Sequence, residues 1–242
     1  MSMLPRPPKA VIFDMDGLLL DTEILYRQSI IAAAQDAGLP IGPSIYEGML
    51  GRPWVSIAEL LRDHYGQDFQ ADLFRAAWLA HFDRLTETEL RLKPGVVALL
   101  DLLDEHKLPR AVCTSSAHFQ VEHHLGALGI LDRFHHIVAH GDYPRGKPAP
   151  DPYLAAAERL GIAPSDCLAL EDSYNGIRSA ASAGMMAVMV PDMLSPTDEI
   201  RALCAVVAES LDHCCAFFGQ EVAASPAEVG RAIKDTVLRR NQ

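Results

Sequence analysis

Asp14 directly follows the apolar stretch AVIF, Asp16 comes two positions later, and Gly17 is next. A continuous apolar run that ends at a turn signal is typical of a strand buried on both faces of a parallel sheet. The two carboxylates then belong to the carboxyl edge of that sheet, where open α/β folds bind ligands. Two acids at such a place repel each other and resist desolvation, so a divalent cation is the simplest compensation.

Three further polar groups accompany other expected strands. They are Thr114-Ser115-Ser116 at the end of the strand expected at 110–114, Lys147 in the stiff loop GKPAPD, and Glu171-Asp172 after the strand expected at 167–170. Because parallel strands end at one shared edge, we expect these groups to converge on the two aspartates. The set fits metal-assisted phosphoryl transfer. A carboxylate attacks phosphorus, a metal ion offsets the repulsion, and hydroxyls, N–H groups and a lysine neutralise the equatorial oxygens.

Each group taken alone has a simpler structural interpretation. An Asp-x-Asp-Gly sequence is commonly a turn, Thr-Ser-Ser after a strand commonly caps a helix, and Glu-Asp before a helix is favoured by the helix dipole. A lysine between prolines is usually a solvated loop charge. The occurrence of all four groups in order, each at or beside a strand end, favours a common site over these separate interpretations.

Other residues of metal-binding type lack ligand spacing. The histidines at 123, 124, 135, 136 and 140 show no paired spacing, and we expect them at the surface or as hydrogen-bonded polar residues. The set Cys204, His213, Cys214 and Cys215 contains an adjacent cysteine pair, which is poor spacing for tetrahedral zinc. We expect these cysteines to be small apolar core residues.

Alternating strands and helices after residue 106 are typical of a parallel, doubly wound sheet. Strands are expected at 10–13, 110–114, 136–139, 167–170, 186–190 and, more weakly marked, 205–208. Helices are expected at 96–106, 119–128, 152–160, 174–183, 211–218 and 225–240.

The chain between the first strand and about residue 90 has helical apolar spacing throughout. Its first helix is expected at 22–37, with Thr22 as the N-cap and Gly38 and Pro40 as the stop. We therefore predict an α/β fold, a doubly wound parallel sheet with a Rossmann-like core formed by residues 1–20 and 91–242. A small all-helical cap domain, residues 21–90, is inserted after the first strand.

The composition limits the partners and the compartment. A formal net charge of −11 on 242 residues disfavours nucleic acid and anionic membrane as partners. Five cysteines without a Cys-x-x-Cys pair suit a reduced cytoplasmic protein. We find no signal peptide and no apolar run of membrane-spanning length. We expect a cytoplasmic protein that is a monomer, or a weak dimer.

The ordered motifs DMDG, TSS, GKPAPD and EDSYNG resemble those of the haloacid dehalogenase superfamily of phosphohydrolases over about residues 9–192. The helical insertion is similar to the α-helical cap of the subgroup that contains β-phosphoglucomutase and small phosphatases. This resemblance implies a Mg²⁺-dependent phosphatase that hydrolyses a small phosphate monoester, such as a sugar phosphate, through an aspartyl phosphate. It also implies a cap that closes over the site and excludes water.

The resemblance also implies roles for individual residues. Asp14 would be the nucleophile and Asp16 the general acid and base. Thr114 and Ser115 would hold the phosphoryl group through a hydroxyl and a backbone N–H, and Lys147 would contact both nucleophile and phosphate.

The implied Mg²⁺ site uses the carboxylates of Asp14 and Asp172 and the carbonyl of Asp16, with Glu171 acting through water. Arg52 lies between cap helices where this subgroup often places a substrate contact. A surface arginine is the alternative interpretation.

Three other activities remain as alternatives. Dehalogenases do not need the second acid, so Asp16 argues against one. A phosphomutase of the β-phosphoglucomutase type carries a histidine in the first cap helix, where this sequence has Tyr26. A phospho-aspartate signalling receiver would be shorter, uncapped and without an acid two residues after its aspartate.

Overall fold

The computed structural model describes residues 4–50, 52 and 54–218. Its centre is a six-stranded parallel sheet in the order β3-β2-β1-β4-β5-β6. The strands are β1 (Ala10–Phe13), β2 (Arg110–Ala117), β3 (His136–His140), β4 (Cys167–Glu171), β5 (Met186–Met189) and β6 (Val206–Val207). The order runs outward from β1 in both directions, which confirms the predicted doubly wound α/β fold.

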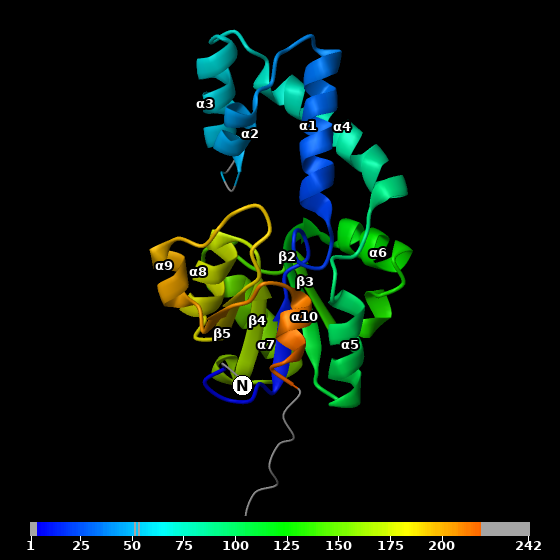
Figure 1. Ribbon diagram of the computed structural model, residues 1–242, viewed down its shortest axis with the longest axis vertical. Coiled ribbons are helices and arrows are strands. Elements are labelled where there is room, and N and C mark those ends of the chain that lie inside the picture. Colours follow the sequence, from blue (N-terminus) through cyan, green and yellow to red (C-terminus); the bar gives the residue numbers. More distant parts are fainter. Residues whose placement is uncertain (1–3, 51, 53, 219–242) are drawn as a thin grey trace, which may run out of the picture.

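Helices cover both faces of this sheet (Figure 1). They are α5 (Val96–Glu105), α6 (His118–Ala127), α7 (Asp151–Leu160), α8 (Tyr174–Ser182), α9 (Asp198–Leu203) and α10 (Leu211–Cys215), with short 3₁₀ turns at Leu131–Arg133 and Pro164–Asp166. Alternate residues of β1 enter two separate cores. Val11 and Phe13 pack in the core of α5, α6 and α10, whereas Ala10 and Ile12 pack in the core of α7, α8 and α9.

Four further helices form a unit beyond the carboxyl edge of the sheet (Figure 1). They are α1 (Thr22–Asp36), α2 (Pro43–Met49), α3 (Trp54–Tyr65) and α4 (Ala71–Glu89). These helices bury a hydrophobic cluster of their own, which includes Leu61, Phe74 and Trp78.

The two chain connections to this helical unit pair with each other. Leu20 forms an antiparallel bridge with Leu92. The amide of Asp21 donates to the carbonyl of Arg91 at 2.9 Å, and the amide of Lys93 donates to the carbonyl of Leu19 at 2.9 Å. The helical unit is therefore joined to the sheet by a narrow two-stranded ribbon.

Several sequence predictions need correction. Thr22 does not cap α1, because the helix begins at Thr22 after Asp21 and the Thr22 hydroxyl accepts the amide of Gly17 at 3.1 Å. The last strand residue of β2 is Ala117 rather than Thr114. Helix α9 was not expected, since it buries only Ile200 and has too few residues for a periodic pattern.

The structure also tests the predictions for the carboxyl-terminal helices and for the histidines. Helix α10 ends at Cys215, before the expected residue 218, and the helix expected at 225–240 lies outside the described residues. His124 is buried and its Nδ1 has no hydrogen-bond partner among the described residues, so the expectation of a surface or hydrogen-bonded residue is wrong there. In the described part of the chain, no helix is long and apolar enough to cross a membrane.

Candidate active site

The site begins where β1 ends, at the carboxyl edge between β1 and β4. The amide of Asp14 continues the sheet by donating to the carbonyl of Leu170 at 3.0 Å. Three residues later Gly17 turns the chain with φ +82°, a conformation that favours glycine. A Cβ at Gly17 would also lie 2.4 Å from Oδ2 of Asp172. The glycine therefore lets the backbone pass directly beside the acidic end of β4.

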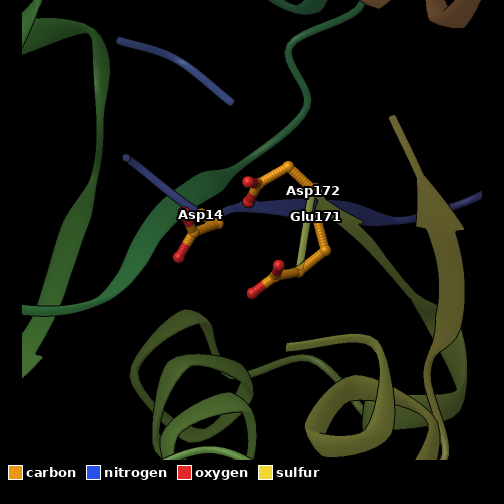
Figure 2. A group of neighbouring side chains, drawn as sticks. All are labelled: Asp14, Glu171 and Asp172. Carbon is orange, nitrogen blue, oxygen red and sulfur yellow. The ribbon is translucent and has the colours of Figure 1, made fainter. Parts of the chain in front are cut away.

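Three carboxylates converge at this edge. Figure 2 shows Asp14 from the end of β1 and Glu171 and Asp172 from the end of β4 with their carboxylates gathered together. One carboxylate oxygen from each of the three residues lies within 4.8 Å of the others. This arrangement of oxygen atoms fits a hard divalent cation such as Mg²⁺.

Lys147 enters the same cluster from the loop before α7. Its Nζ donates to Oδ1 of Asp14 at 2.5 Å, to Oε1 of Glu171 at 2.6 Å and to the carbonyl of Cys113 at 3.0 Å. Burial alone would lower the pKa of Lys147, but the carboxylates of Asp14 and Glu171 outweigh it and raise that pKa well above its usual value. Lys147 is therefore a permanently charged partner of both acids.

One lysine does not balance three acids. Burial raises the pKa of Asp14 from 3.8 to about 8; Lys147 opposes the rise, and Glu171 and Asp16 add to it. Burial likewise raises the pKa of Asp172 well above its usual value, with the charges of Glu171 and Asp14 adding to the effect. The protein groups alone leave an excess of negative charge, which a bound cation would offset.

Glu171 is fully engaged by the protein. Its Oε1 accepts Lys147 and the hydroxyl of Tyr153 at 3.1 Å, while its Oε2 accepts the amide and hydroxyl of Ser173, both at 2.9 Å. A Cβ at Gly176 would lie 1.7 Å from Oε1, so α8 approaches this carboxylate as closely as its backbone allows. Among the described residues, no hydrogen-bond donor contacts the Asp172 carboxylate. Asp172 is thus better placed than Glu171 to give both oxygens to an ion.

Asp16 is held apart from the three clustered acids. Its Oδ2 accepts the hydroxyl of Ser116 at 2.7 Å. Burial raises the pKa of Asp16, while the hydrogen bond from Ser116 and the charge of His124 oppose that rise. A raised pKa favours the protonated form of the Asp16 carboxyl, which is the form that a general acid needs.

Of the other predicted site residues, Thr114 and Ser115 line the active-site cavity, whereas Arg52 lies at the surface. A cavity of about 390 Å³ is lined by Asp14, Asp16, Thr114, Ser115, Lys147 and Asp172, together with Glu23, Leu50, Ser173, Tyr174, Asn175, Arg178 and Leu194. The hydroxyl of Thr114 accepts the amide of Ser116 at 3.0 Å. Arg52 is exposed and does not line this cavity.

Four residues with contacts in the site receive no individual role from the sequence. They are Glu23, Ser116, Tyr153 and Ser173. Ser116 and Ser173 belong to the motifs TSS and EDSYNG, and that membership was an available signal. Tyr153 carried no such signal, because its helix pattern indicated only a buried position.

Comparison with known proteins gives a consistent result. The family model of haloacid dehalogenase-like hydrolases matches residues 8–184. A Drosophila melanogaster protein named probable pseudouridine-5′-phosphatase is 37% identical over 187 residues, covering 75% of this chain and 80% of that protein. The phosphorylated carbohydrates phosphatase of Thermotoga maritima is 30% identical over 178 residues, covering 73% and 82%. The crystal structure of CbbY from Rhodobacter sphaeroides in complex with phosphate superposes with a TM-score of 0.69 at 27% identity, covering 85% and 95%.

Proposed function

This chain belongs to the haloacid dehalogenase-like hydrolase family, and from that premise we propose a Mg²⁺-dependent phosphatase that acts through an aspartyl phosphate. Its similarity to named phosphatases makes it an enzyme of the phosphoric monoester hydrolase class. The observation that carries the proposal is the group of three carboxylates around one lysine at the ends of β1 and β4.

The proposed first step is attack by the Asp14 carboxylate on the phosphorus of the ester. The bond from phosphorus to the ester oxygen breaks, and Asp16 gives its proton to the departing alkoxide, so the alcohol leaves neutral. Lys147, whose Nζ already contacts Asp14, neutralises charge on the transferred phosphoryl group. Thr114 and Ser115 line the cavity where its equatorial oxygens would lie.

The proposed second step returns the enzyme to its starting state. Asp16, now ionised, takes a proton from water as the oxygen of that water attacks phosphorus. The bond from phosphorus to Asp14 breaks, which restores the Asp14 carboxylate and releases inorganic phosphate. A bound Mg²⁺ would be held by Asp14 and Asp172 with the backbone carbonyl of Asp16, and by Glu171 through water. The ion supplies positive charge that reduces the repulsion between nucleophile and phosphate.

The surroundings of Tyr26 favour this hydrolysis over phosphomutase chemistry. Tyr26 takes the position of the histidine implied for a mutase, and its ring packs against Phe82 with the centroids 4.1 Å apart. Burial raises the pKa of its hydroxyl further above the usual value, with Asp16 and Glu23 adding to that effect. A phenol in this state is a poor proton carrier near neutral pH.

The substrate is proposed to be a small phosphorylated metabolite, a sugar phosphate or a related compound, as the name of the Thermotoga relative implies for that protein. We propose that residues 21–90 close as a cap over the core of residues 1–20 and 91–242. The separate hydrophobic cluster of α1–α4 and the narrow ribbon that joins them to the sheet support this. Arg52, in the connection between α2 and α3, would approach the substrate on closure. The five cysteines are free thiols, which suits the proposed cytoplasmic location of a monomer or weak dimer.

The test is hydrolysis of p-nitrophenyl phosphate by the purified protein. Activity should require Mg²⁺, stop on full chelation by EDTA and return when Mg²⁺ is restored. Asp14→Asn should abolish turnover without unfolding the protein, whereas Asp132→Asn, at an exposed position, should leave it unchanged. Turnover that survives chelation would refute the metal requirement, and turnover by Asp14→Asn would remove Asp14 as the nucleophile.

A further inference from the structure

The last residues of β2 leave the regular pairing of the sheet just before α6 begins. Cys113 pairs with Val138 and Ala117 pairs with His140, so β2 has three residues (114–116) in an interval where β3 has one. The pairing of β2 with β1 on the other side ends before this interval. Such a bulge takes its residues out of the ladder and is common beside active sites. The orientation of the peptides in this bulge must therefore come from contacts outside the ladder.

Side-chain hydrogen bonds hold the bulge. The Thr114 hydroxyl accepts the Ser116 amide at 3.0 Å, and the Ser116 hydroxyl donates to Oδ2 of Asp16 at 2.7 Å. The Tyr143 hydroxyl donates to the carbonyl oxygen of Thr114 at 3.0 Å. The Tyr143 contact differs from the other two, because it holds the peptide unit between Thr114 and Ser115.

The anchored carbonyl also sets the direction of the next amide. The peptide bond between Thr114 and Ser115 is trans, and in a planar trans peptide the carbonyl and the following N–H point in opposite directions. Ser115 lines the active-site cavity, whereas Tyr143 is not among the described residues that line it. The Thr114 carbonyl is thus held toward an anchor outside the cavity, and the Ser115 N–H is directed away from that anchor.

Tyr143 is itself firmly placed in the loop between β3 and α7, four residues before Lys147. Its partly buried ring packs against the core beneath α7, α8 and α9. A Cβ added at Gly146 would lie 3.7 Å from Cε2 of Tyr143, so the loop passes close to the ring. Burial raises the pKa of the Tyr143 hydroxyl, while a hydrogen bond with the Ser115 side chain opposes the rise. The hydroxyl therefore keeps its proton at neutral pH and remains a donor.

We propose that Tyr143 is a positioning residue for phosphoryl transfer, whose hydroxyl holds the Thr114 carbonyl so that the Ser115 N–H faces the transferred phosphoryl group. This inference rests on the proposed phosphatase function and adds a residue to that site. Without the hydroxyl, the peptide is free to rotate and to turn its carbonyl oxygen toward the negatively charged phosphoryl oxygens. A donor that is held in place before the reaction stabilises the transition state more than one that must reorient.

The kinetic test is Tyr143→Phe, which removes the hydroxyl and keeps the ring. In the presence of Mg²⁺, kcat for p-nitrophenyl phosphate should fall about tenfold, less than the roughly 10²–10³-fold loss expected when such a donor is removed outright. The inhibition constant for orthovanadate, an analogue of the five-coordinate phosphorus of the transition state, should rise by a similar factor. A merely structural role would lower the fraction of active protein, which lowers kcat but leaves the inhibition constant unchanged.

Tyr65→Phe is the matched control. The Tyr65 hydroxyl also donates to a backbone carbonyl, that of Pro40 at 2.7 Å, but this contact lies in the helical unit. Its kcat and its orthovanadate inhibition constant should stay within about twofold of the parent values. The Tm of the two variants should fall by similarly small amounts, because each loses one hydrogen bond of the same kind.

The orientation of the peptide can also be observed directly. The dipeptide Thr-Ser occurs once in the sequence, at Thr114-Ser115, so labelling with ¹³C′-threonine and ¹⁵N-serine selects the Ser115 amide in an NMR spectrum. On addition of Mg²⁺ and orthovanadate, this amide proton should shift downfield in the parent, as expected for a new charge-assisted hydrogen bond. In Tyr143→Phe the shift at saturating orthovanadate should be smaller.

The possible failures are distinguishable. A parent protein without Mg²⁺-dependent p-nitrophenyl phosphate hydrolysis refutes the proposed function, whereas the amide shift does not depend on turnover. If that hydrolysis is present, the inference alone is wrong when Tyr143→Phe keeps the parent kcat and the parent inhibition constant for orthovanadate. A lowered kcat with an unchanged inhibition constant, or a Ser115 amide that shifts equally in parent and variant, would also overturn it.

Discussion

Removal of the proposed nucleophile should stabilise the metal-free protein, even though it abolishes activity. In the folded protein the pKa of Asp14 is raised from 3.8 to about 8, chiefly by burial. A group whose folded pKa is raised contributes stability that is fully present below pH 3.8 and is lost as the pH rises through about 8. Near neutral pH, the Asp14 carboxyl is ionised in the unfolded chain and must take up a proton on folding, which weakens the folded state, and Asp14→Asn removes that cost.

The magnitude follows from the size of the shift. At about 1.4 kcal/mol for each pKa unit, the cost of Asp14 at pH 7 is on the order of 4 kcal/mol. Relaxation of the site and the loss of the contact with Lys147 reduce this, so about 2 kcal/mol is the expected gain. For a chain of this size that corresponds to a rise in Tm of roughly 4–8 °C.

The assay is thermal unfolding in EDTA at several pH values, followed by circular dichroism. The advantage of Asp14→Asn over the parent should grow between about pH 5 and pH 8, because the parent loses stability over that interval. Saturating Mg²⁺ should shrink or reverse the difference, since the parent has the carboxylate that binds the ion. Asp132→Asn is the control and should follow the parent throughout. An Asn variant that is less stable than the parent in EDTA, by an amount independent of pH, would refute the reasoning.

Two further substitutions test the local geometry of the site. Gly17→Ala should lower both Tm and kcat more than the control Gly38→Ala does. Both glycines have positive φ, but only at Gly17 would the added Cβ meet Asp172, at 2.4 Å. Equal losses of Tm and kcat in the two variants would contradict the close approach. Ser116→Ala should lower kcat about tenfold by removing a hydrogen bond to a charged Asp16. The same change should raise the pKa of Asp16 and move the alkaline limb of the kcat profile to higher pH, so an unmoved limb would exclude Asp16 as the general acid.

The sheet and the family were predictable because their signals are local and repeated. The apolar run before Asp14 and the regular alternation of strands and helices after residue 106 predict a doubly wound parallel sheet. The structure confirms that fold, and the family model confirms the family. The sequence does not show which of the clustered acids is held by protein groups and which is free to bind an ion. Nothing in the sequence around Glu171 indicates that Tyr153 and Ser173 saturate its two oxygens, since those contacts depend on how α7 and α8 pack.

The sequence also does not predict that the Trp78 Nε1 and the Tyr46 hydroxyl are buried without a hydrogen-bond partner among the described residues. Trp78 and Tyr46 lie on different helices, and helical periodicity predicts only that their side chains are buried. Whether a buried donor finds a partner depends on neighbours that are distant in sequence. Thr22 shows the same limit, because its hydroxyl is used by Gly17 in a tertiary contact instead of by the helix it begins.

The central position of β1 also affects the order in which the chain can fold. Val11 pairs with Arg110 on one side and with Leu168 on the other, so neither neighbour exists when β1 leaves the ribosome. One backbone edge of this apolar strand stays unpaired until β2 has been made and the other until β4 has been made, whereas α1–α4 can bury their cluster earlier. The strand that precedes the proposed nucleophile is therefore synthesised before both of its neighbours, and its edges are open to mispairing in the nascent protein until those neighbours appear.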